Sequence, residues 1–162
     1  MSGVEQSGTN ITPSHLTAWV TTGVIGDAGF SYANTYGRLQ VSAPGLNFNA
    51  ANTDNPINIA LPAGFTRYRI ALIIISGASA AINMATCGVF TAQSAGGTAV
   101  VTTGTAITVT ATAGDTNNNM QSLPVNDQNT MFFIDATLYF RVQTAEGSSA
   151  TANVNIFYEP LP

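Results

Sequence analysis

The sequence of 162 residues contains no lysine, one cysteine and one histidine, and charged residues make up only 7% of it. A single cysteine, Cys87, excludes an intrachain disulfide, and a single histidine, His15, excludes a metal site built from several imidazoles. Four arginines and eight acidic residues give a net charge of −4. Because nucleic-acid binding depends on neutralising phosphates with basic side chains, we expect no nucleic-acid partner.

Long apolar segments are also missing. The longest apolar run, residues 70–82, is interrupted by Ser76, Gly77 and Ser79 and is too short to cross a bilayer. Residues 1–10 are polar and carry one charge, at Glu5, which is unlike a secretory signal peptide. The sequence offers no basic amphipathic helix for a membrane surface. We therefore expect no membrane partner.

The motifs of common catalytic sites are absent from the sequence. It contains no GxSxG, HExxH or P-loop pattern. Cys87 lies among apolar residues, which favours a buried structural thiol over a nucleophile. The acidic residues are spread mostly one to a loop, whereas hydrolysis by paired carboxylates needs two at a defined separation. We expect a protein that is not an enzyme, with no catalytic residue, no metal and no cofactor.

Two polar loops carry residues that could bind a ligand. Asp115, Asn117 and Asn119 alternate like the oxygen ligands of a calcium loop, but the glycine and distal glutamate of an EF-hand are missing, which favours an ordinary polar turn. In the glycine-rich stretch 23–37, aromatic side chains stand beside an asparagine. They either stack on sugar rings or hold the loop against the edge of the domain; the candidate glycan contacts are Tyr32, Asn34 and Tyr36.

Short runs of alternating apolar and polar residues dominate the chain after residue 37, and each run ends at a Gly, Pro or Asx signal. These patterns predict about eight β-strands. The runs lie at residues 37–43, 56–61, 66–76, 82–92 (with a bulge at Gly88), 98–103 and 106–112 (paired across Gly104), 120–125, 138–144 and 151–159. The last two are expected to form a hairpin through residues 146–149. No stretch of ten residues has helical spacing, so we predict an all-β, antiparallel β-sandwich that is jelly-roll-like.

The strand predicted at 66–76 has two unlike faces. Strict alternation puts Tyr68, Ile70, Leu72 and Ile74 on one face, and puts Arg67, Arg69, Ala71, Ile73 and Ile75 on the other. The second face changes from charged to apolar, so either a second layer or a neighbouring subunit must cover its apolar end. The arginines either pair with acids of a neighbouring subunit or keep the face soluble. The candidate subunit interface is therefore Ile73, Ile75, Arg67 and Arg69.

Residues 1–16 show no periodicity and are rich in Ser, Gly, Thr and Asn. We interpret them as an extended N-terminal arm, with a disordered tail as the alternative, and residues 17–162 as a single β-sandwich domain. Trp19, the only tryptophan, is either an anchor in the core or a contact onto a neighbouring subunit. The candidate contacts of the arm are Ile11, His15, Leu16 and Trp19.

The composition suits packing against identical copies. The chain contains 22 Thr, 23 Ala, 15 Asn and 15 Gly, which take the place of the usual charged residues. A surface of such residues offers neutral hydrogen bonds with little salt dependence and few sites for trypsin-like proteases. This lysine-free, β-rich composition, the polar arm and the segments 138–142 and 153–158 resemble structural proteins of tailed bacteriophages, in particular the small β-sandwich decoration (cement) proteins of phage heads.

The resemblance implies a non-enzymatic protein of the virion. Decoration proteins of that kind are homotrimers that bind the major capsid protein and tie neighbouring capsomers together. We would then expect synthesis in the host cytoplasm, a place on the capsid exterior, and an arm around residues 11–19 that reaches onto the shell. The alternatives are a receptor-binding knob of a tail fibre or spike, which recognises host glycans through the tyrosine loop, and an adhesin or carbohydrate-binding domain of the host.

Overall fold

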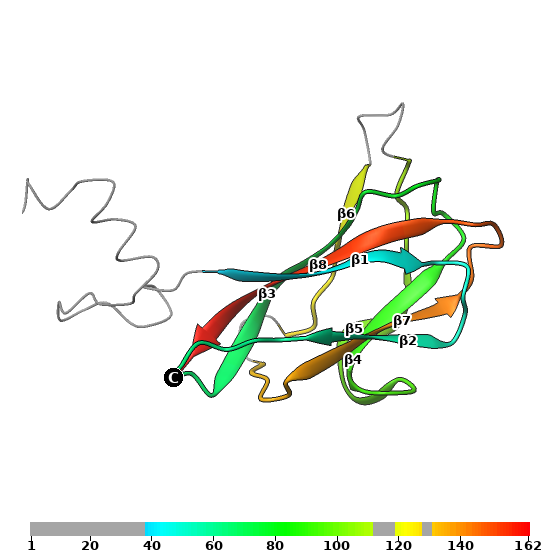
Figure 1. The fold of residues 1–162 in the computed structure, drawn as a ribbon. Coiled ribbons are helices and arrows are strands. Elements are labelled where there is room, and N and C mark those ends of the chain that lie inside the picture. Colours follow the sequence, from blue (N-terminus) through cyan, green and yellow to red (C-terminus); the bar gives the residue numbers. More distant parts are fainter. Residues whose placement is uncertain (1–37, 112–118, 128–130) are drawn as a thin grey trace, which may run out of the picture.

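The structure is a computed structural model that describes residues 38–111, 119–127 and 131–162. Within these ranges it contains eight β-strands and no helix (Figure 1). The strands are β1 (Leu39–Asn47), β2 (Thr53–Asn58), β3 (Arg67–Ser76), β4 (Thr86–Ala92), β5 (Gly96–Ala106), β6 (Met120–Leu123), β7 (Thr137–Thr144) and β8 (Thr151–Leu161). The predicted all-β class is confirmed. No helix in the described part of the chain is long and apolar enough to cross a membrane.

The strands form two four-stranded antiparallel sheets packed as a sandwich, with the orders β1-β8-β3-β6 and β2-β7-β4-β5 (Figure 1). The pairing is nested along the chain: β1 pairs with β8, β2 with β7, β3 with β6 and β4 with β5. Pairs between β3 and β8 and between β4 and β7 complete the sheets. Apart from the hairpin between β4 and β5, each connection between successive strands therefore crosses from one sheet to the other.

The core lies between the sheets and is filled by the alternate residues of facing strands. Alternate residues of the last two strands are all buried, namely Leu138, Phe140 and Val142 of β7 and Ala152, Val154, Ile156 and Tyr158 of β8. Tyr68 packs against the rings of Phe133 and Tyr158, each 5.7 Å away between centroids. Its hydroxyl donates to the Asp135 carbonyl at 2.8 Å, so the buried phenol keeps a hydrogen bond.

A bulge in β3 overturns the predicted faces of that strand. Its register with β8 shifts between Ile70 and Leu72, so Ala71 is an extra residue and the alternation reverses beyond it. Ile73 and Ile75 have no exposed surface within a single chain. The second sheet, the first of the two predicted alternatives, covers them, so the prediction that they form a subunit interface is wrong.

The predicted hairpin at the end of the chain is also wrong. β7 and β8 belong to opposite sheets, and residues 145–150 form an arch between them. Alternation predicts that each strand has one buried face, but it does not predict to which of the two sheets the strand belongs. Two strands that face each other across a core have the same pattern as two strands paired side by side.

Three predicted boundaries need smaller changes. Pro44 and Gly45 lie at a bulge inside β1 and do not end it. β5 continues as one strand through Gly104, whose φ of 80° suits glycine, in place of the two strands expected at 98–103 and 106–112. Residues 107–109 instead pair with the segment before β4, through a bridge between Ile82 and Val109. The bulge expected at Gly88 is wrong: Gly88 pairs in regular register with Arg141 of β7, and where the register of β4 with β5 shifts, the extra residues lie on β5, between Val101 and Thr105.

Candidate subunit interface

Apolar side chains lie on the outer face of the β1-β8-β3-β6 sheet. Leu72 and Ile74 of β3 point outward because of the bulge at Ala71, and Phe157 of β8 stands opposite Leu72. All three are partly exposed. We call Leu72, Ile74 and Phe157 the outer patch. Strict alternation without the bulge would place Leu72 and Ile74 in the core. The sequence pattern therefore indicated Ile73 and Ile75 as the outward residues, which is the reverse of the structure.

Neutral polar side chains surround the outer patch and bond to one another. Asn155 accepts a hydrogen bond of 2.7 Å from the Ser42 hydroxyl and donates one of 3.1 Å to the Ser76 hydroxyl. Gln40 donates to the same Asn155 oxygen at 3.2 Å. Because these groups already have partners within the chain, covering them leaves few polar atoms unsatisfied. The face therefore combines a small apolar centre with an uncharged rim, which is the make-up of a protein–protein contact.

Charge on this face is confined to one end. Glu159 accepts hydrogen bonds from Arg38 at 3.2 Å and from Arg69 at 3.1 Å. Burial raises the pKa of the Glu159 carboxyl, but the two arginines outweigh that effect and the pKa is lowered overall. Arg67 donates to the Pro162 carbonyl at 2.9 Å, and its guanidinium lies 5.5 Å from the ring centroid of Phe132. Arg67 and Arg69, predicted at the interface, thus lie on this face with partners in their own chain.

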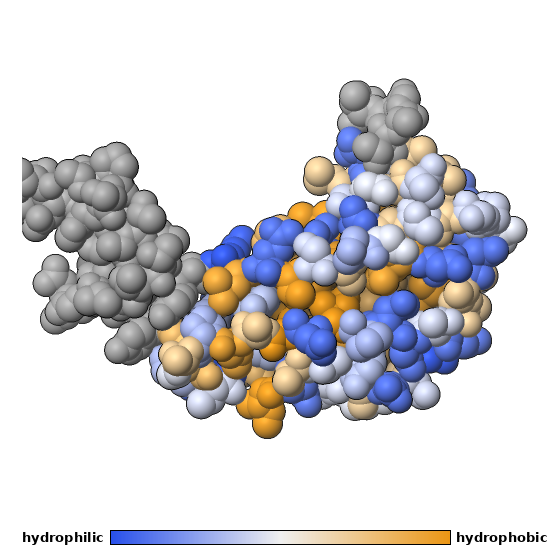
Figure 2. Space-filling model, viewed as in Figure 1, coloured by the Kyte–Doolittle hydropathy of each residue, from blue (hydrophilic) through white to orange (hydrophobic). Residues whose placement is uncertain are grey.

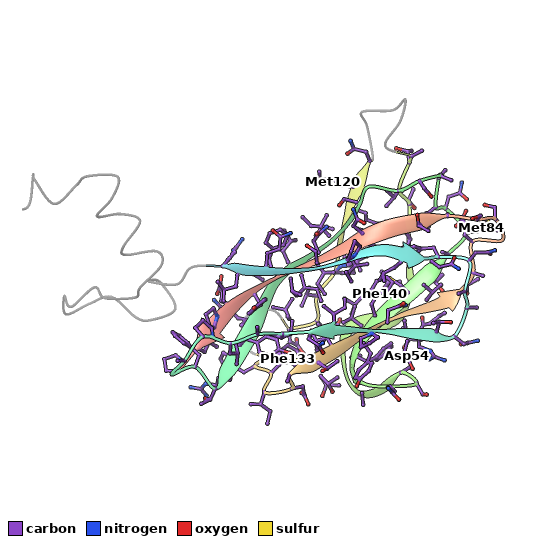
Figure 3. All side chains as sticks on the ribbon, viewed as in Figure 1. Asp54, Met84, Met120, Phe133 and Phe140 are labelled. Carbon is purple, nitrogen blue, oxygen red and sulfur yellow. The ribbon has the colours of Figure 1, made fainter. Side chains whose placement is uncertain are left out.

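Two exposed apolar residues extend the face beside these arginines. Phe133 forms a bridge with Tyr68 through two backbone hydrogen bonds of 2.9 Å and points into the core (Figure 3). Its neighbours Phe132 and Ile134 therefore point outward, and they are 50% and 78% exposed. Exposed side chains of this size next to an apolar patch are typical of an interaction surface.

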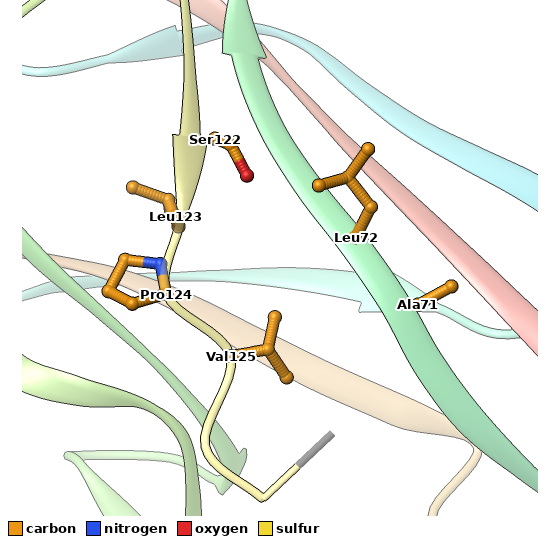
Figure 4. Close-up of a pocket in the computed structure, with 6 residues that line it drawn as sticks. All are labelled: Ala71, Leu72, Ser122, Leu123, Pro124 and Val125. Atoms are coloured by element: carbon orange, nitrogen blue, oxygen red, sulfur yellow. The ribbon is translucent and has the colours of Figure 1, made fainter. Parts of the chain in front are cut away.

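A shallow hollow of about 570 Å³ opens beside Leu72. It exists because β6 pairs with β3 only as far as Ile73, after which the chain diverges from β3. Figure 4 shows the two sides of the hollow, with β3 on one and the end of β6 on the other. The lining residues are Ala71, Leu72, Ser122, Leu123, Pro124 and Val125. Only Ser122 brings a polar side chain, and backbone atoms supply the rest of the polar surface of the hollow.

The described residues also carry charged and reactive groups away from this face. Arg141 donates to Asp54 at 2.8 Å on the opposite sheet. Cys87 is buried, as predicted, and burial raises the pKa of its thiol to about 12. Within residues 38–111, 119–127 and 131–162, no three His, Cys, Asp or Glu side chains gather as a metal site.

The remaining predicted site residues lie outside the described ranges. This applies to the arm and its contacts Ile11, His15, Leu16 and Trp19, and to the candidate glycan contacts Tyr32, Asn34 and Tyr36. It applies also to Asp115 and Asn117 of the polar loop. Among the described residues, the sequence analysis missed the outer patch, Phe132 and Ile134. The consecutive apolar residues 131–134 were a signal for the last two, since a run without polar residues cannot bury every side chain on one face.

Comparison with known proteins yields a distant structural likeness. No protein-family model and no curated protein matches the chain. Among solved structures, the chain is similar to one described as "Cyanophage Pam1 capsid asymmetric unit", with 13% identity and a TM-score of 0.30. The match covers 78% of this chain and 86% of that one. At this TM-score the likeness establishes neither a common fold nor a common function.

Proposed function

We propose that this protein is a non-enzymatic structural protein of a phage virion, and that it decorates the capsid exterior as a homotrimer bound to the major capsid protein. The observation that carries the proposal is the outer face of the β1-β8-β3-β6 sheet. Its apolar centre, its hollow and its internally bonded neutral rim fit contact with further copies of the chain. Charge is restricted to one end of that face.

The strand order supports a role in a shell. Nested antiparallel pairing of first with last, second with seventh, third with sixth and fourth with fifth strands is what a long ribbon of paired strands gives when it is rolled up. We infer from it that the sandwich is a jelly roll. That fold occurs in viral capsid proteins, and also in lectin domains and cupins, so it agrees with the proposal without selecting it.

The surface chemistry supports exposure on a particle. The chain has no lysine, and all four of its arginines bond to groups of the same chain or stack beside an aromatic ring. Contacts made by such a surface depend on apolar burial and neutral hydrogen bonds, which salt screens little. In this role each trimer would add buried area across capsomer boundaries and so stabilise the filled head by mass action.

Copy number in purified particles tests the proposal. Mass spectrometry with labelled peptides would compare this chain with the major shell protein, and we expect the two in comparable amounts. A few copies per particle would overturn the decoration role in favour of a receptor-binding knob of a tail fibre or spike. Absence from all particles would overturn the virion role altogether.

The subunit contact can be tested apart from the particle. Ile74→Asp places a charge in the outer patch, and we expect the variant to sediment as a monomer while the parent chain sediments as a trimer. Thr103→Asp, an exposed position on β5 of the other sheet, is the matched control and should remain trimeric. Circular dichroism would confirm that both variants are folded. An Ile74→Asp variant that stays trimeric would place the contact elsewhere.

A further inference from the structure

The charged end of the outer face has its side chains in two rows across the β1-β8-β3-β6 sheet. In the first row, Arg69 of β3 pairs with Glu159 of β8, and Arg38 reaches the same carboxylate at 3.2 Å from the start of β1. In the second row, Arg67 of β3 pairs with Leu161 of β8. Three arginines therefore stand together around one glutamate.

Both rows continue onto the segment that precedes β7. Phe133 forms an antiparallel bridge with β3. Antiparallel register then places Phe132 beside Arg69, and it places Ile134 beside Arg67 in the same way. Figure 2 shows hydrophobic side chains that project from the domain beside the start of β7. We call this surface the arginine end; its residues are Arg38, Arg67, Arg69, Phe132 and Ile134.

The arginine end carries more positive charge than its own acid neutralises. Glu159 is the one acid among the described residues of the two rows, so three positive charges face one negative charge. Asp135 points away from the outer face by alternation, and its charge raises the pKa of the buried Tyr68 phenol. Arg67 forms no ion pair with a described residue, since its Nε–H donates to the carbonyl oxygen of Pro162. The excess charge is therefore available to a partner.

The exposed groups at this end are donors and apolar side chains. Among the described residues, the Nε–H is the one donor of Arg38 and of Arg67 that has an acceptor, which leaves their terminal amino groups for a carboxylate. Phe132 and Ile134 are 50% and 78% exposed beside these groups. Arginine and phenylalanine are both enriched where proteins meet, and this end combines them.

The sign and extent of the charge limit the partner. A short acidic segment interacts mainly with the arginine end, because exposed charges more than about 10 Å away are screened. A nucleic acid is a long polyanion, and the net charge of −4 on the whole chain disfavours its approach. The observations therefore favour an acidic protein segment over a nucleic acid.

We propose that the arginine end binds an acidic segment of a partner protein, with carboxylates on the arginines and an apolar side chain against Phe132 and Ile134. The proposal is independent of the virion role and of the subunit contact. Seven residues of β3, or about 23 Å, separate Arg67 from Ile74 of the outer patch, so the two surfaces are distinct.

Binding of a labelled acidic peptide to the purified intact protein tests the proposal. The probe is a short fluorescein-labelled peptide of glutamates and leucines, and its control has glutamine in place of every glutamate. Fluorescence anisotropy measures both. We expect only the acidic probe to bind, and its affinity should fall about tenfold between about 50 mM and about 500 mM salt, because the charges are exposed.

Variants locate the contact. Arg38→Gln and Arg67→Gln should each weaken binding of the acidic probe severalfold. Thr103→Asp, exposed on β5 of the other sheet, is the matched control, because it changes the net charge of the chain by the same amount and should leave binding unchanged. Phe132→Ser should weaken binding but keep its salt dependence. Circular dichroism would confirm folding, which we expect because Glu159 keeps Arg69 as a partner in both arginine variants.

The proposal is overturned if the acidic probe does not bind at low salt. It is also overturned if Thr103→Asp weakens binding as much as the arginine variants do, since net charge alone would then account for the affinity. Equal binding of the glutamine control peptide would show that carboxylates are not recognised. Single-stranded DNA that binds more tightly than the acidic probe, and that loses affinity in the same variants, would overturn the proposal in favour of a nucleic acid.

Discussion

The backbone N–H of Ala85 donates a hydrogen bond of 2.9 Å to the carboxylate of Glu146, although 61 residues separate them. The same carboxylate oxygen accepts from the N–H groups of Asn83 at 3.0 Å and Met84 at 2.8 Å. The side chain of Glu146 lies in the arch between β7 and β8, and residues 83–85 lead into β4. One buried carboxylate thus joins the crossing between the two sheets to the start of a central strand.

Removing this carboxylate should destabilise the fold. Glu146→Ala leaves three backbone N–H groups without their acceptor, and we expect a loss of about 3 kcal/mol in the free energy of unfolding. Glu146→Gln keeps an acceptor oxygen but loses the charge, so about 1 kcal/mol should be lost. Urea denaturation measures both. Ser148→Ala, exposed in the same arch, is the control, and a Glu146→Ala variant as stable as this control would contradict the role of the carboxylate.

Stability should fall in acid because of the same group. Burial raises the pKa of the Glu146 carboxyl, but the hydrogen bonds from Met84, Asn83 and Ala85 outweigh burial and lower the pKa below its ordinary value of 4.5. A carboxyl with a lower pKa in the folded state stabilises the protein fully above the unfolded pKa. That contribution is lost as the pH falls from about 4.5 through the folded pKa.

The melting temperature as a function of pH measures this loss. The parent chain should lose stability below about pH 4.5, and Glu146→Gln should lose less over the same interval because one of the responsible groups is gone. Part of the slope should remain in the variant, since the pKa values of Asp54 and Glu159 are also lowered. Parallel curves for the parent chain and Glu146→Gln would show that Glu146 does not contribute.

The contrast between β8 and β3 shows what the sequence could predict. In β8, period-two alternation places Val154 and Ile156 on one face, and the structure buries that face, because the alternation of faces is a local property of a strand. In β3 the bulge at Ala71 carries no glycine or proline signal, so the faces beyond it are predicted in reverse. For this reason alone, the interface residues predicted from the sequence were Ile73 and Ile75, whereas the structure turns Leu72 and Ile74 outward.

The sequence could not predict which strands pair or which long-range contacts form, and the reason is different. Which sheet holds a strand depends on contacts between residues far apart in the sequence, so the nested order of strands left no local pattern. Glu146 looks like an ordinary acidic turn residue, because its three hydrogen-bond donors lie more than 60 residues earlier. The glycine at position 88 is a local signal for a bulge, but the extra residues lie on the partner strand β5, which the sequence around Gly88 does not reveal.

A methyl group at position 88 should be poorly tolerated. The β-carbon of an alanine there would lie 2.6 Å and 2.7 Å from two ring carbons of Phe90, which is itself only 2% exposed. We expect Gly88→Ala to cost about 1–3 kcal/mol through overpacking. A double-mutant cycle with Phe90→Leu checks the cause by urea denaturation. The cost of Gly88→Ala should shrink when the ring is absent, and an unchanged cost would exclude the ring as the cause.

The Cys87 thiol should be inert until the protein unfolds. Burial raises its pKa to about 12, so at about pH 8 only about one molecule in 10⁴ carries the reactive thiolate, which is also shielded from reagent. We expect no reaction with Ellman's reagent in the folded protein within an hour, and complete reaction at once in urea. Glu146→Ala provides a sensitive comparison, because a less stable fold exposes the thiol more often and should react faster. Rapid reaction of the parent chain would show that the strand carrying Cys87 opens without global unfolding.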